Sequence, residues 1–378
     1  MLNALHDLVN WTPLGLPAYL FVITIVVFFH ELGHYAMARA FDVKVDVFSI
    51  GFGRELVGWT AKSGTRWKIS LIPFGGYVKF AGDANAASVP DREAAEQVPV
   101  AARGGLLFFR PLHQRALVAA AGPLANFALA VVLFTGLLLH DGRTIMTPII
   151  GTVSPGSAAA EAGMLPGDRI LRIGDTPIDD FQQMSEIIGL SGGRKLSIAL
   201  ERGGHERTVQ LVPRNTRARD MLGEMEDRLM IGVASQAHPR LTTVYYSLPG
   251  AVVAACGMTW DILSGTLEGV GQMLRGQISV SQLHGPVGIA DITQKIAVLG
   301  FMALLNLSAV LSVSIGLVNL FPIPLLDGGH LLYYGCEAVL GRPLGERAQD
   351  VGFRLGLALV LGFAILVTWN DLIRLNLF

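Results

Sequence analysis

The stretch LPAYLFVITIVVFFHELGHYAMARA, residues 16–40, combines two properties that seldom occur in one segment. It is apolar over a length that crosses a bilayer as one helix, for which about 20 residues are needed. In its C-terminal half it nevertheless carries His30, Glu31 and His34. Ionisable side chains are costly inside a membrane segment and usually have a function there. The stretch therefore predicts a membrane helix that carries out chemistry.

The spacing in His30-Glu31-Leu32-Gly33-His34 is typical of a zinc site on a helix. Positions four residues apart lie on the same helix face, so the imidazoles of His30 and His34 can reach one metal ion. Glu31 lies off that face and can act as general base toward water at the metal. We therefore predict one zinc ion per chain, with His30 and His34 as ligands and Glu31 as the catalytic base.

A catalytic zinc site usually has three protein ligands, and Asp327 is the best candidate for the third. It lies after an apolar segment, in the run NLFPIPLLDGGH, residues 319–330. Two prolines in this run interrupt the helix and free backbone groups, which a membrane tolerates only beside a protein cavity. His330 is a rival ligand on the same grounds. In the alternative without a metal, Asp327 simply reaches the lipid headgroups.

The composition also excludes several classes of protein. Hydrophobic residues make up 51% of the chain and charged residues only 16%, against roughly 25% charged residues in soluble domains. A net charge of −1 leaves no basic surface for nucleic acid, so no nucleic-acid partner is expected. Two cysteines, Cys256 and Cys336, cannot supply a thiolate zinc site or a disulfide framework. Residues 1–16 lack Lys and Arg, and no cleavage pattern follows, so no cleavable signal peptide is expected.

The hydropathy of the chain predicts a polytopic α-helical membrane protein with four transmembrane helices. So many long apolar segments disfavour the alternative, in which they are buried helices of a soluble enzyme. The predicted spans are about residues 16–40, 116–139, 301–321 and 351–369.

Basic residues set the expected orientation. The segment 39–115 is rich in Lys and Arg, whereas the N-terminal tail has none. The positive-inside rule places this segment in the cytoplasm and puts the N-terminus and residues 140–300 outside. The outside segment also carries basic residues, but long domains translocate regardless of their charge.

The apolar character of residues 248–274 is interrupted by Asp261, Glu268 and several glycines. We predict an amphipathic helix on the outer membrane surface rather than a fifth span. The two histidines and Asp327 share one membrane depth only if a single span separates their helices. A fifth span would put Asp327 on the opposite side of the membrane.

Short alternating runs between residues 41 and 80 predict strands and hairpins, and residues 82–103 predict a flexible loop. Short β-branched runs separated by Gly and Pro turns predict a small β-rich domain over about 147–214. The expected order is a first transmembrane helix with the paired histidines (1–40), a cytoplasmic-side β-hairpin region and loop (41–115), a second transmembrane helix (116–140), the β-rich domain (141–214), a linker with the amphipathic helix (215–300), a third transmembrane helix with Asp327 (301–345) and a fourth (346–378).

Several motifs together resemble one known family, the site-2 proteases. They are the HExxH in a first membrane helix, the distant NxxPxPxLDG, and Ala121-Gly122-Pro123 with Asn126. The likeness is closer to the bacterial regulator of sigma-E protease group, through residues 48–53, 72–79 and 285–290, and it extends from about 17 to 340. It implies that Asp327 outranks His330 as third ligand and that Glu31 activates water to cleave a substrate helix within the bilayer.

The same resemblance implies roles for residues that bind substrate. The segment Gly75, Gly76, Tyr77, Val78 and Lys79 resembles the edge of a re-entrant β-hairpin that pairs with the unwound substrate, a pairing that satisfies freed backbone groups. Asn319 resembles a residue that holds the substrate near the metal, and a structural hydrogen bond that caps the unwound helix is the equal alternative. Asn126 is expected to be structural.

Residues 154–170 resemble a PDZ domain of the bacterial protease type, which implies one periplasmic β-rich PDZ domain. PDZ domains bind peptide ends by strand addition, and residues 149–153 are the expected rim. The best-known members of the group have two such domains. Residues 215–236 are too few for a second one.

We expect an intramembrane zinc metalloendopeptidase of a bacterial inner membrane that cleaves single-span membrane proteins. The resemblance implies membrane-bound anti-sigma factors as substrates, and also remnant signal peptides. One alternative is a membrane-tethered zinc protease with soluble substrates, which the depth of His30 in the first span disfavours. Another is a non-enzymatic membrane scaffold that presents the PDZ domain and retains a vestigial metal site. Glu31 disfavours the scaffold, because metal binding alone does not require it.

Overall fold

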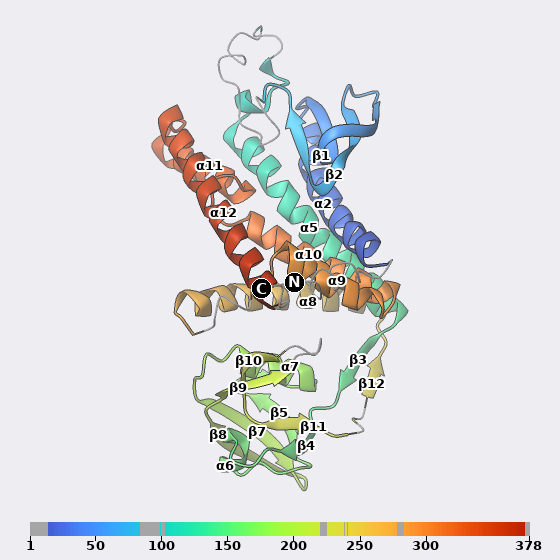
Figure 1. Ribbon diagram of the computed structural model, residues 1–378, viewed down its shortest axis with the longest axis vertical. Helices are drawn as coiled ribbons and strands as arrows, with labels where there is room; N and C mark the ends of the chain where they lie inside the picture. The colour runs from blue at the N-terminus through green and yellow to red at the C-terminus, as the bar shows by residue number, and fades with distance from the viewer. Residues whose placement is uncertain are drawn as a thin grey trace. The chain divides into compact units, whose positions relative to one another are not determined.

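The computed structural model describes residues 14–83, 103–219, 225–237, 241–277 and 283–374, together with Pro99 and Pro239 (Figure 1). The chain forms two compact units, which we call the helical unit and the β-rich unit and describe separately. The predicted flexible loop, 82–103, lies almost wholly outside the described residues. The helical unit comprises Met1–Thr135, Val252–Leu263 and Leu283–Phe378, and the β-rich unit comprises Gly136–Ala251 and Ser264–Gln282.

Long apolar helices occupy the segments that the sequence predicts to be membrane spans. Three predicted spans fall within one helix each, and the span predicted for 301–321 begins with its helix and extends two residues past the helix end at Asn319. A fifth helix, α8 (Leu248–Leu274), is also long and apolar enough to cross a membrane. Because α8 covers the segment predicted to lie on the membrane surface, a total of four crossings stays a prediction. The helices that contain the predicted spans are α2 (Gly15–Ala40), α5 (Leu112–His140), α10 (Phe301–Asn319) and α12 (Glu346–Arg374).

A short helix, α9 (Pro286–Ala297), packs against α2, α10 and α12. Its first turn is held by the buried carboxylate of Asp371 in α12, which accepts from the backbone N–H of Gly285 at 3.1 Å and of Gly288 at 2.8 Å. Neither glycine leaves room for a Cβ, because an added carbon would collide with Asp371 or its neighbour Val367. The close approach therefore explains the glycines at this helix start.

The chain breaks between α10 and α11 (Asp327–Leu340) in a tight irregular turn. Leu325 adopts a φ of 110°, which side chains rarely adopt, and Gly328 and Gly329 pack against the backbone of residues 320–324 where no Cβ fits. This turn places Asp327 at the first position of α11. The prediction that the prolines end the helix before Asp327 is confirmed.

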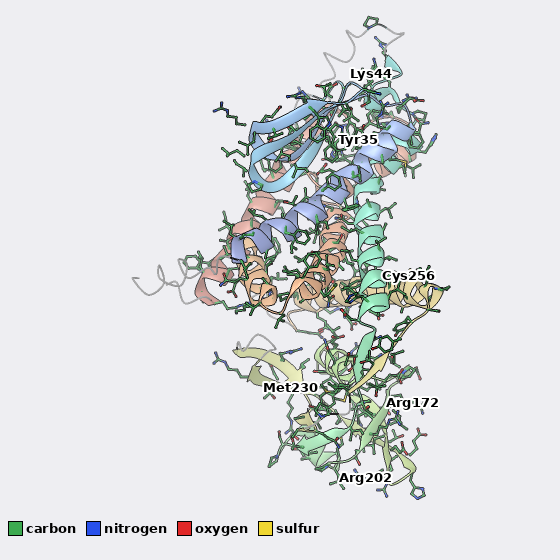
Figure 2. The ribbon with its side chains drawn as sticks, turned by 90° about the vertical axis from the view of Figure 1, so that its right-hand side faces the viewer. Tyr35, Lys44, Arg172, Arg202, Met230 and Cys256 are labelled. Atoms are coloured by element: carbon green, nitrogen blue, oxygen red, sulfur yellow. The ribbon has the colours of Figure 1, made fainter. Side chains whose placement is uncertain are left out.

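The strands predicted between residues 41 and 80 form one hairpin, β1 (Val45–Thr60) and β2 (Arg66–Phe80). Residues 47–50 pair with both 66–69 and 76–79. The segment 76–79 is therefore an outer edge, with no second strand partner in the part of the chain that the structure describes. The hairpin is fixed to α2 by apolar side chains that include Tyr35, which lies where α2 meets the hairpin (Figure 2). The ring centroid of Tyr35 is 5.8 Å from that of Phe48 and 5.2 Å from that of Trp67.

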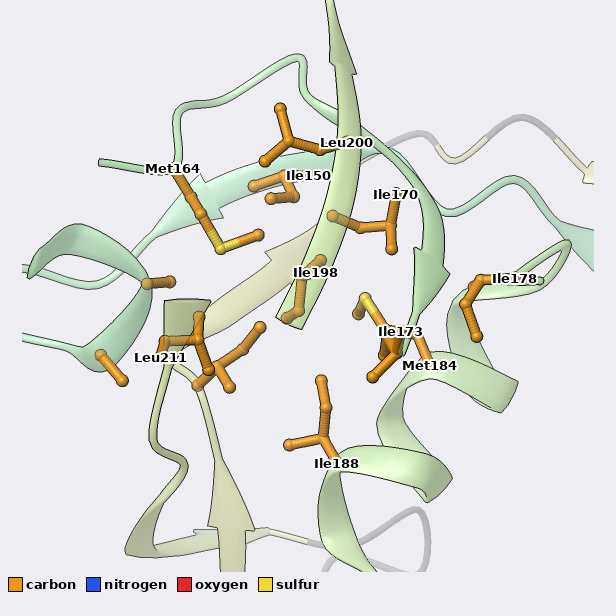
Figure 3. Close-up of a cluster of buried hydrophobic side chains, with 13 residues drawn as sticks. Ile150, Met164, Ile170, Ile173, Ile178, Met184, Ile188, Ile198, Leu200 and Leu211 are labelled. Carbon is orange, nitrogen blue, oxygen red and sulfur yellow. The ribbon is translucent and has the colours of Figure 1, made fainter. Parts of the chain in front are cut away.

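The β-rich unit is built on an antiparallel sheet in the order β6-β5-β7-β8, with α6 (Ala158–Glu161) and α7 (Phe181–Gly189). Its core is rich in isoleucine and wholly buried (Figure 3). Asp168, itself 1% exposed, accepts from Arg202 Nε and Nη2 at 2.6 Å each. The strands of this sheet are β5 (Arg169–Ile173), β6 (Thr176–Pro177), β7 (Leu196–Arg202) and β8 (His205–Leu211).

Three further strand pairs complete the β-rich unit and correct one expectation. The predicted rim, 149–153, contains β4 (Ile150–Val153), which pairs with β11 (Val233–Ser235) on one side. On its other side Ile150 exchanges backbone hydrogen bonds with Gly167 and Asp168. The rim is therefore paired along one side and bonded only at Ile150 on the other among the described residues, and the fold extends past residue 214 to β11. The other pairs are β3 (Arg143–Met146) with β12 (Leu241–Val244) and β9 (Arg214–Arg219) with β10 (Met225–Met230).

Candidate metal centre

Three side chains from two distant segments meet inside the helical unit. His30 and His34 lie one turn apart on α2, each only 8% exposed, with their Nε2 atoms 3.2 Å apart. The turn before α11 brings the Asp327 carboxylate to both, with Oδ2 3.1 Å from His30 Nε2 and Oδ1 3.3 Å from His34 Nε2. Among the described residues, this is the cluster of His, Cys, Asp or Glu whose ligand atoms all lie within 4.8 Å of one another.

These three residues fit a zinc ion in chemistry and in spacing. Imidazole nitrogen and carboxylate oxygen are the usual ligands of catalytic zinc, with bonds of about 2.0–2.2 Å. Neighbouring ligand atoms around a tetrahedral ion of that size are about 3.3 Å apart. The three separations match this value within a few tenths of an ångström. Three protein ligands also leave one position open for reaction, as catalytic zinc sites require.

Helix α5 packs against the two histidines through small residues. Gly33 of α2 faces the carbonyl of Ala121, and Gly122 faces the imidazole of His34; a Cβ on either glycine would collide with its neighbour. The close approach lets the Val118 carbonyl lie 2.8 Å from His34 Nδ1. The Ala-Gly-Pro motif thus permits the close contact that orients the His34 imidazole.

Glu31 lines a cavity of about 400 Å³ together with His30, His34 and Asp327. The backbone N–H of Val78 donates to its carboxylate, so the outer edge of the hairpin faces this residue. Gly76 lies so close that an added Cβ would meet Glu31 Cγ at 3.2 Å. The arrangement places an acid or base, a metal-binding cluster and an open strand edge around one cavity.

An HExxH helix, a carboxylate that meets its two histidines and long apolar helices together indicate a membrane metalloprotease, and comparison with known proteins agrees. The sequence profile of Peptidase family M50 matches residues 18–363. The chain belongs to this family. M50 is the site-2 protease family, so the protein is a membrane zinc metalloprotease, and zinc is its cofactor.

Individual relatives cover nearly the whole chain. A Rhizobium meliloti protein, provisionally named a zinc metalloprotease, is 41% identical over 358 residues, which are 94% of this chain and 96% of the relative. An Agrobacterium fabrum protein with the same kind of name is 41% identical over 355 residues, 94% of each chain. Metalloprotease MmpA of Caulobacter vibrioides is 39% identical over 386 residues, 96% of each chain.

The other residues predicted for the M50 site divide into those the structure brings to the cavity and those it does not. Asn319, the last residue of α10, lines the cavity. Gly75, Gly76, Tyr77 and Val78 line it as well, whereas Lys79 continues the edge without lining the cavity.

His330, the rival metal ligand, also lines the cavity, but it is not among the three residues whose ligand atoms converge. It lies three residues after Asp327 on α11, which is nearly one helical turn. The geometry therefore favours Asp327 over His330 as partner of the two histidines.

Sequence reasoning missed a charged cluster on the cavity wall. Arg115 of α5 forms an ion pair with Glu337 of α11, whose closest atoms are 2.5 Å apart, and its guanidinium lies 5.0 Å from the ring centroid of Tyr334. Arg115 and Tyr334 line the cavity. The sequence contained a signal, because Arg115 adjoins a predicted span where an unpaired charge is unfavourable. Its partner is more than two hundred residues away and could not be named from the sequence.

Proposed function

We propose that this M50 protease cleaves single-span membrane proteins within the bilayer, with His30, His34 and Asp327 as zinc ligands and Glu31 as general base. The observation that carries the proposal is the convergence of the three ligand atoms beside Glu31 in one cavity, between apolar helices. A protease with soluble substrates would not need its metal-binding residues on membrane-length helices.

The residues divide the reaction between them. Bound zinc supplies Lewis acidity, which polarises a carbonyl and makes water more acidic. Glu31 accepts a proton from the attacking water and passes it to the leaving amine nitrogen as the peptide C–N bond breaks. The Val78 N–H that donates to Glu31 orients the carboxylate for this transfer. His30, His34 and Asp327 hold their ligand atoms in place and take no proton.

The outer edge of β2 gives a physical route for presenting the scissile bond. A transmembrane helix hides its peptide groups in its own hydrogen bonds, so a substrate must unwind before attack. An extended segment can then pair with the open edge at 76–79, which satisfies its freed backbone groups. Asn319, which lines the same cavity, is proposed to hold the substrate beside the metal; its alternative role is to cap the unwound end of α10.

The proposed substrate class rests on the family resemblance, and the proposed location rests on that resemblance and on the distribution of Lys and Arg. We assign the protein to a bacterial inner membrane, crossing it several times, with residues 140–300 in the periplasm. Membrane-bound anti-sigma factors are the proposed substrates, and remnant signal peptides are further candidates.

The β-rich unit is proposed to be a PDZ domain that binds peptide ends and filters substrates. Because β4 is paired along one side and bonded at Ile150 on the other, we assign peptide addition to β11, whose second edge has no strand partner in the described part of the chain. Strand addition there would provide main-chain hydrogen bonds to an incoming peptide end.

The central test separates the base from the ligands. Glu31→Gln keeps size and polarity but removes the base, so cleavage of a single-span substrate should fall roughly 10²-fold or more. Zinc should stay near one ion per chain, because Glu31 is not a ligand. Metal content and cleavage are measured on the same detergent-purified samples. The inactive variant can also trap substrates in cells, and identification of the captured proteins tests the proposed substrate class.

Asp327→Asn is the matched comparison, because an amide is a poorer zinc ligand than a carboxylate. Zinc content and cleavage should fall together, and His34→Ala should lower both further. Full zinc and full activity in Asp327→Asn would remove Asp327 from the ligand set and make His330 the next candidate.

The orientation has its own test. A periplasm-active reporter fused after residue 219 should be active, and the same reporter fused after residue 95 should be inactive. The opposite result would overturn the assignment of residues 140–300 to the periplasm.

A further inference from the structure

Both proposed histidine ligands make a second contact with α5, through the ring nitrogen that faces away from Asp327. His34 Nδ1 contacts the Val118 carbonyl at 2.8 Å, and His30 Nδ1 contacts the side-chain amide of Asn126 at 3.3 Å. A histidine that binds a metal through Nε2 usually donates its Nδ1–H to a neighbouring acceptor, which fixes the tautomer and the ring orientation. The carbonyl of Val118 can only accept, so it fixes His34 in this form.

His30 needs an equivalent acceptor, and Asn126 is the residue placed to supply one. The two ends of an Asn amide have nearly the same shape, so the group can present either Nδ2 or Oδ1 to a neighbour. With Nδ2 facing His30, Oδ1 is buried without a hydrogen-bond partner among the described residues. Rotating the amide by half a turn directs Oδ1 to His30 Nδ1–H, which leaves the His30 Nε2 lone pair free for a metal.

The backbone around Asn126 is held firmly enough for a positioning role. Asn126 is wholly buried, and its carbonyl accepts from Ser312 Oγ of α10 at 2.8 Å. Gly316 of α10 packs so closely that an added Cβ would lie 3.1 Å from the Pro123 carbonyl and 3.2 Å from Asn126 Cβ. Asn126 thus contacts α2 through its side chain and α10 through its backbone, and α10 is the helix that leads to Asp327.

We propose that Asn126 is a positioning residue for His30, whose side-chain oxygen accepts from Nδ1–H and holds Nε2 toward the metal. The inference rests on the proposed ligand set and deepens it. It replaces the expectation that Asn126 is structural, because a structural role would need only its size and its packing. A positioning role requires a hydrogen-bond acceptor at this place.

The test measures zinc affinity rather than activity. Detergent-purified protein carrying Glu31→Gln is titrated against a chromogenic zinc chelator, and the thermal midpoint is recorded after metal removal. Asn126→Leu, which keeps the volume but lacks an acceptor, should weaken zinc binding about 10–100-fold. Asn126→Asp, which keeps an acceptor, should bind zinc at least as tightly as the parent. Ser308→Ala is the control, because it removes another buried polar group, whose hydroxyl donates to the Leu304 carbonyl of its own helix and to no other acceptor in the described part of the chain.

Zinc affinity that is unchanged in Asn126→Leu, or equally weakened in Asn126→Asp, would overturn the inference. If Asn126→Leu does not fold, a tenfold or greater loss of zinc affinity in Asn126→Asp would by itself overturn the inference. A loss of affinity matched by Ser308→Ala would show a general packing effect and would also count against it. His30→Ala in the same assay separates the two levels: unchanged affinity there would refute the ligand set itself, whereas a loss there with no effect of Asn126→Leu would refute only the role of Asn126.

Discussion

The β-rich unit buries the carboxylate of Asp168 and the helical unit half-buries that of Asp327, and the two are used differently. Asp168 in the β-rich unit faces Arg202, whose guanidinium donates to both oxygens. Asp327 in the helical unit faces two imidazoles, which can be neutral and then have lone pairs of their own. A carboxylate paired with a permanent cation is satisfied and stabilises a fold. One that faces neutral imidazoles leaves oxygen and nitrogen lone pairs available to a metal ion.

Metal removal should therefore produce the largest difference in response between the two units. Chelation should abolish cleavage and increase amide hydrogen exchange around His30–His34 and the start of α11, because bound zinc stabilises only the state that holds it. Exchange in the core strands β5 and β7 should be unchanged. Hydrogen exchange with mass spectrometry, before and after chelation and after zinc is restored, measures this. Equal loosening of both units would show that the division is wrong.

The buried carboxylate of Asp371 predicts a smaller effect, which is a loss of stability without loss of the metal. Asp371→Ala leaves two buried N–H groups of α9 without their acceptor, which should cost about 2–3 kcal/mol and lower the thermal midpoint by several degrees. Zinc content should stay near one per chain, because Asp371 is not in the metal cluster. Asp350→Ala on the same helix is the control, since Asp350 is exposed and pairs only with Arg354 at the surface. A midpoint equal to that of the control would contradict the proposed capping.

The Asp168 pair predicts an effect that depends on pH. Burial opposes ionisation of Asp168, but the hydrogen bonds from Arg202 outweigh it and hold the pKa of this carboxyl below its usual range. A folded-state pKa below the unfolded value means that the pair stabilises fully above about pH 4 and that this contribution is lost as the pH falls further.

Asp168→Asn should remove that part of the acid sensitivity and raise exchange in β5 and β7 at neutral pH. Asp175→Asn, a change at an exposed carboxylate, should do neither. Hydrogen exchange of the full chain between about pH 3 and 6 measures both variants. An acid response in Asp168→Asn identical to that of the parent would mean that the pair does not govern it.

Removing the β-rich domain should have the smallest effect on catalysis itself. Met146 of β3 lies opposite Leu241 of β12, so a short Gly-containing turn can replace residues 148–239 and close the two strands as a hairpin. Cleavage of a short single-span substrate should stay within about twofold, and cleavage of substrates with long periplasmic tails should rise. Complete loss of cleavage in a variant with full zinc would give the domain a direct part in catalysis.

The sequence alone determined the elements whose signals are local. Membrane-length apolar runs give their helices directly, because hydropathy is a sum over neighbouring residues. The i, i+4 spacing of His30 and His34 gives their common face, because helix geometry is fixed. Pro322 and Pro324 likewise mark the end of α10 before Asp327, since proline cannot continue the helical hydrogen bonds.

Only the tertiary structure decided what depends on contacts between distant segments. Three features join residues that are far apart in sequence. They are the approach of Asp327, rather than His330, to the two histidines, the pairing of β4 with β11, and the contacts from α5 to the histidines. No local pattern encodes which partner a buried polar atom finds, because that partner is set by how helices and strands pack. For this reason Asn126 was expected to be structural from the sequence, and its amide beside His30 became visible only in the folded chain.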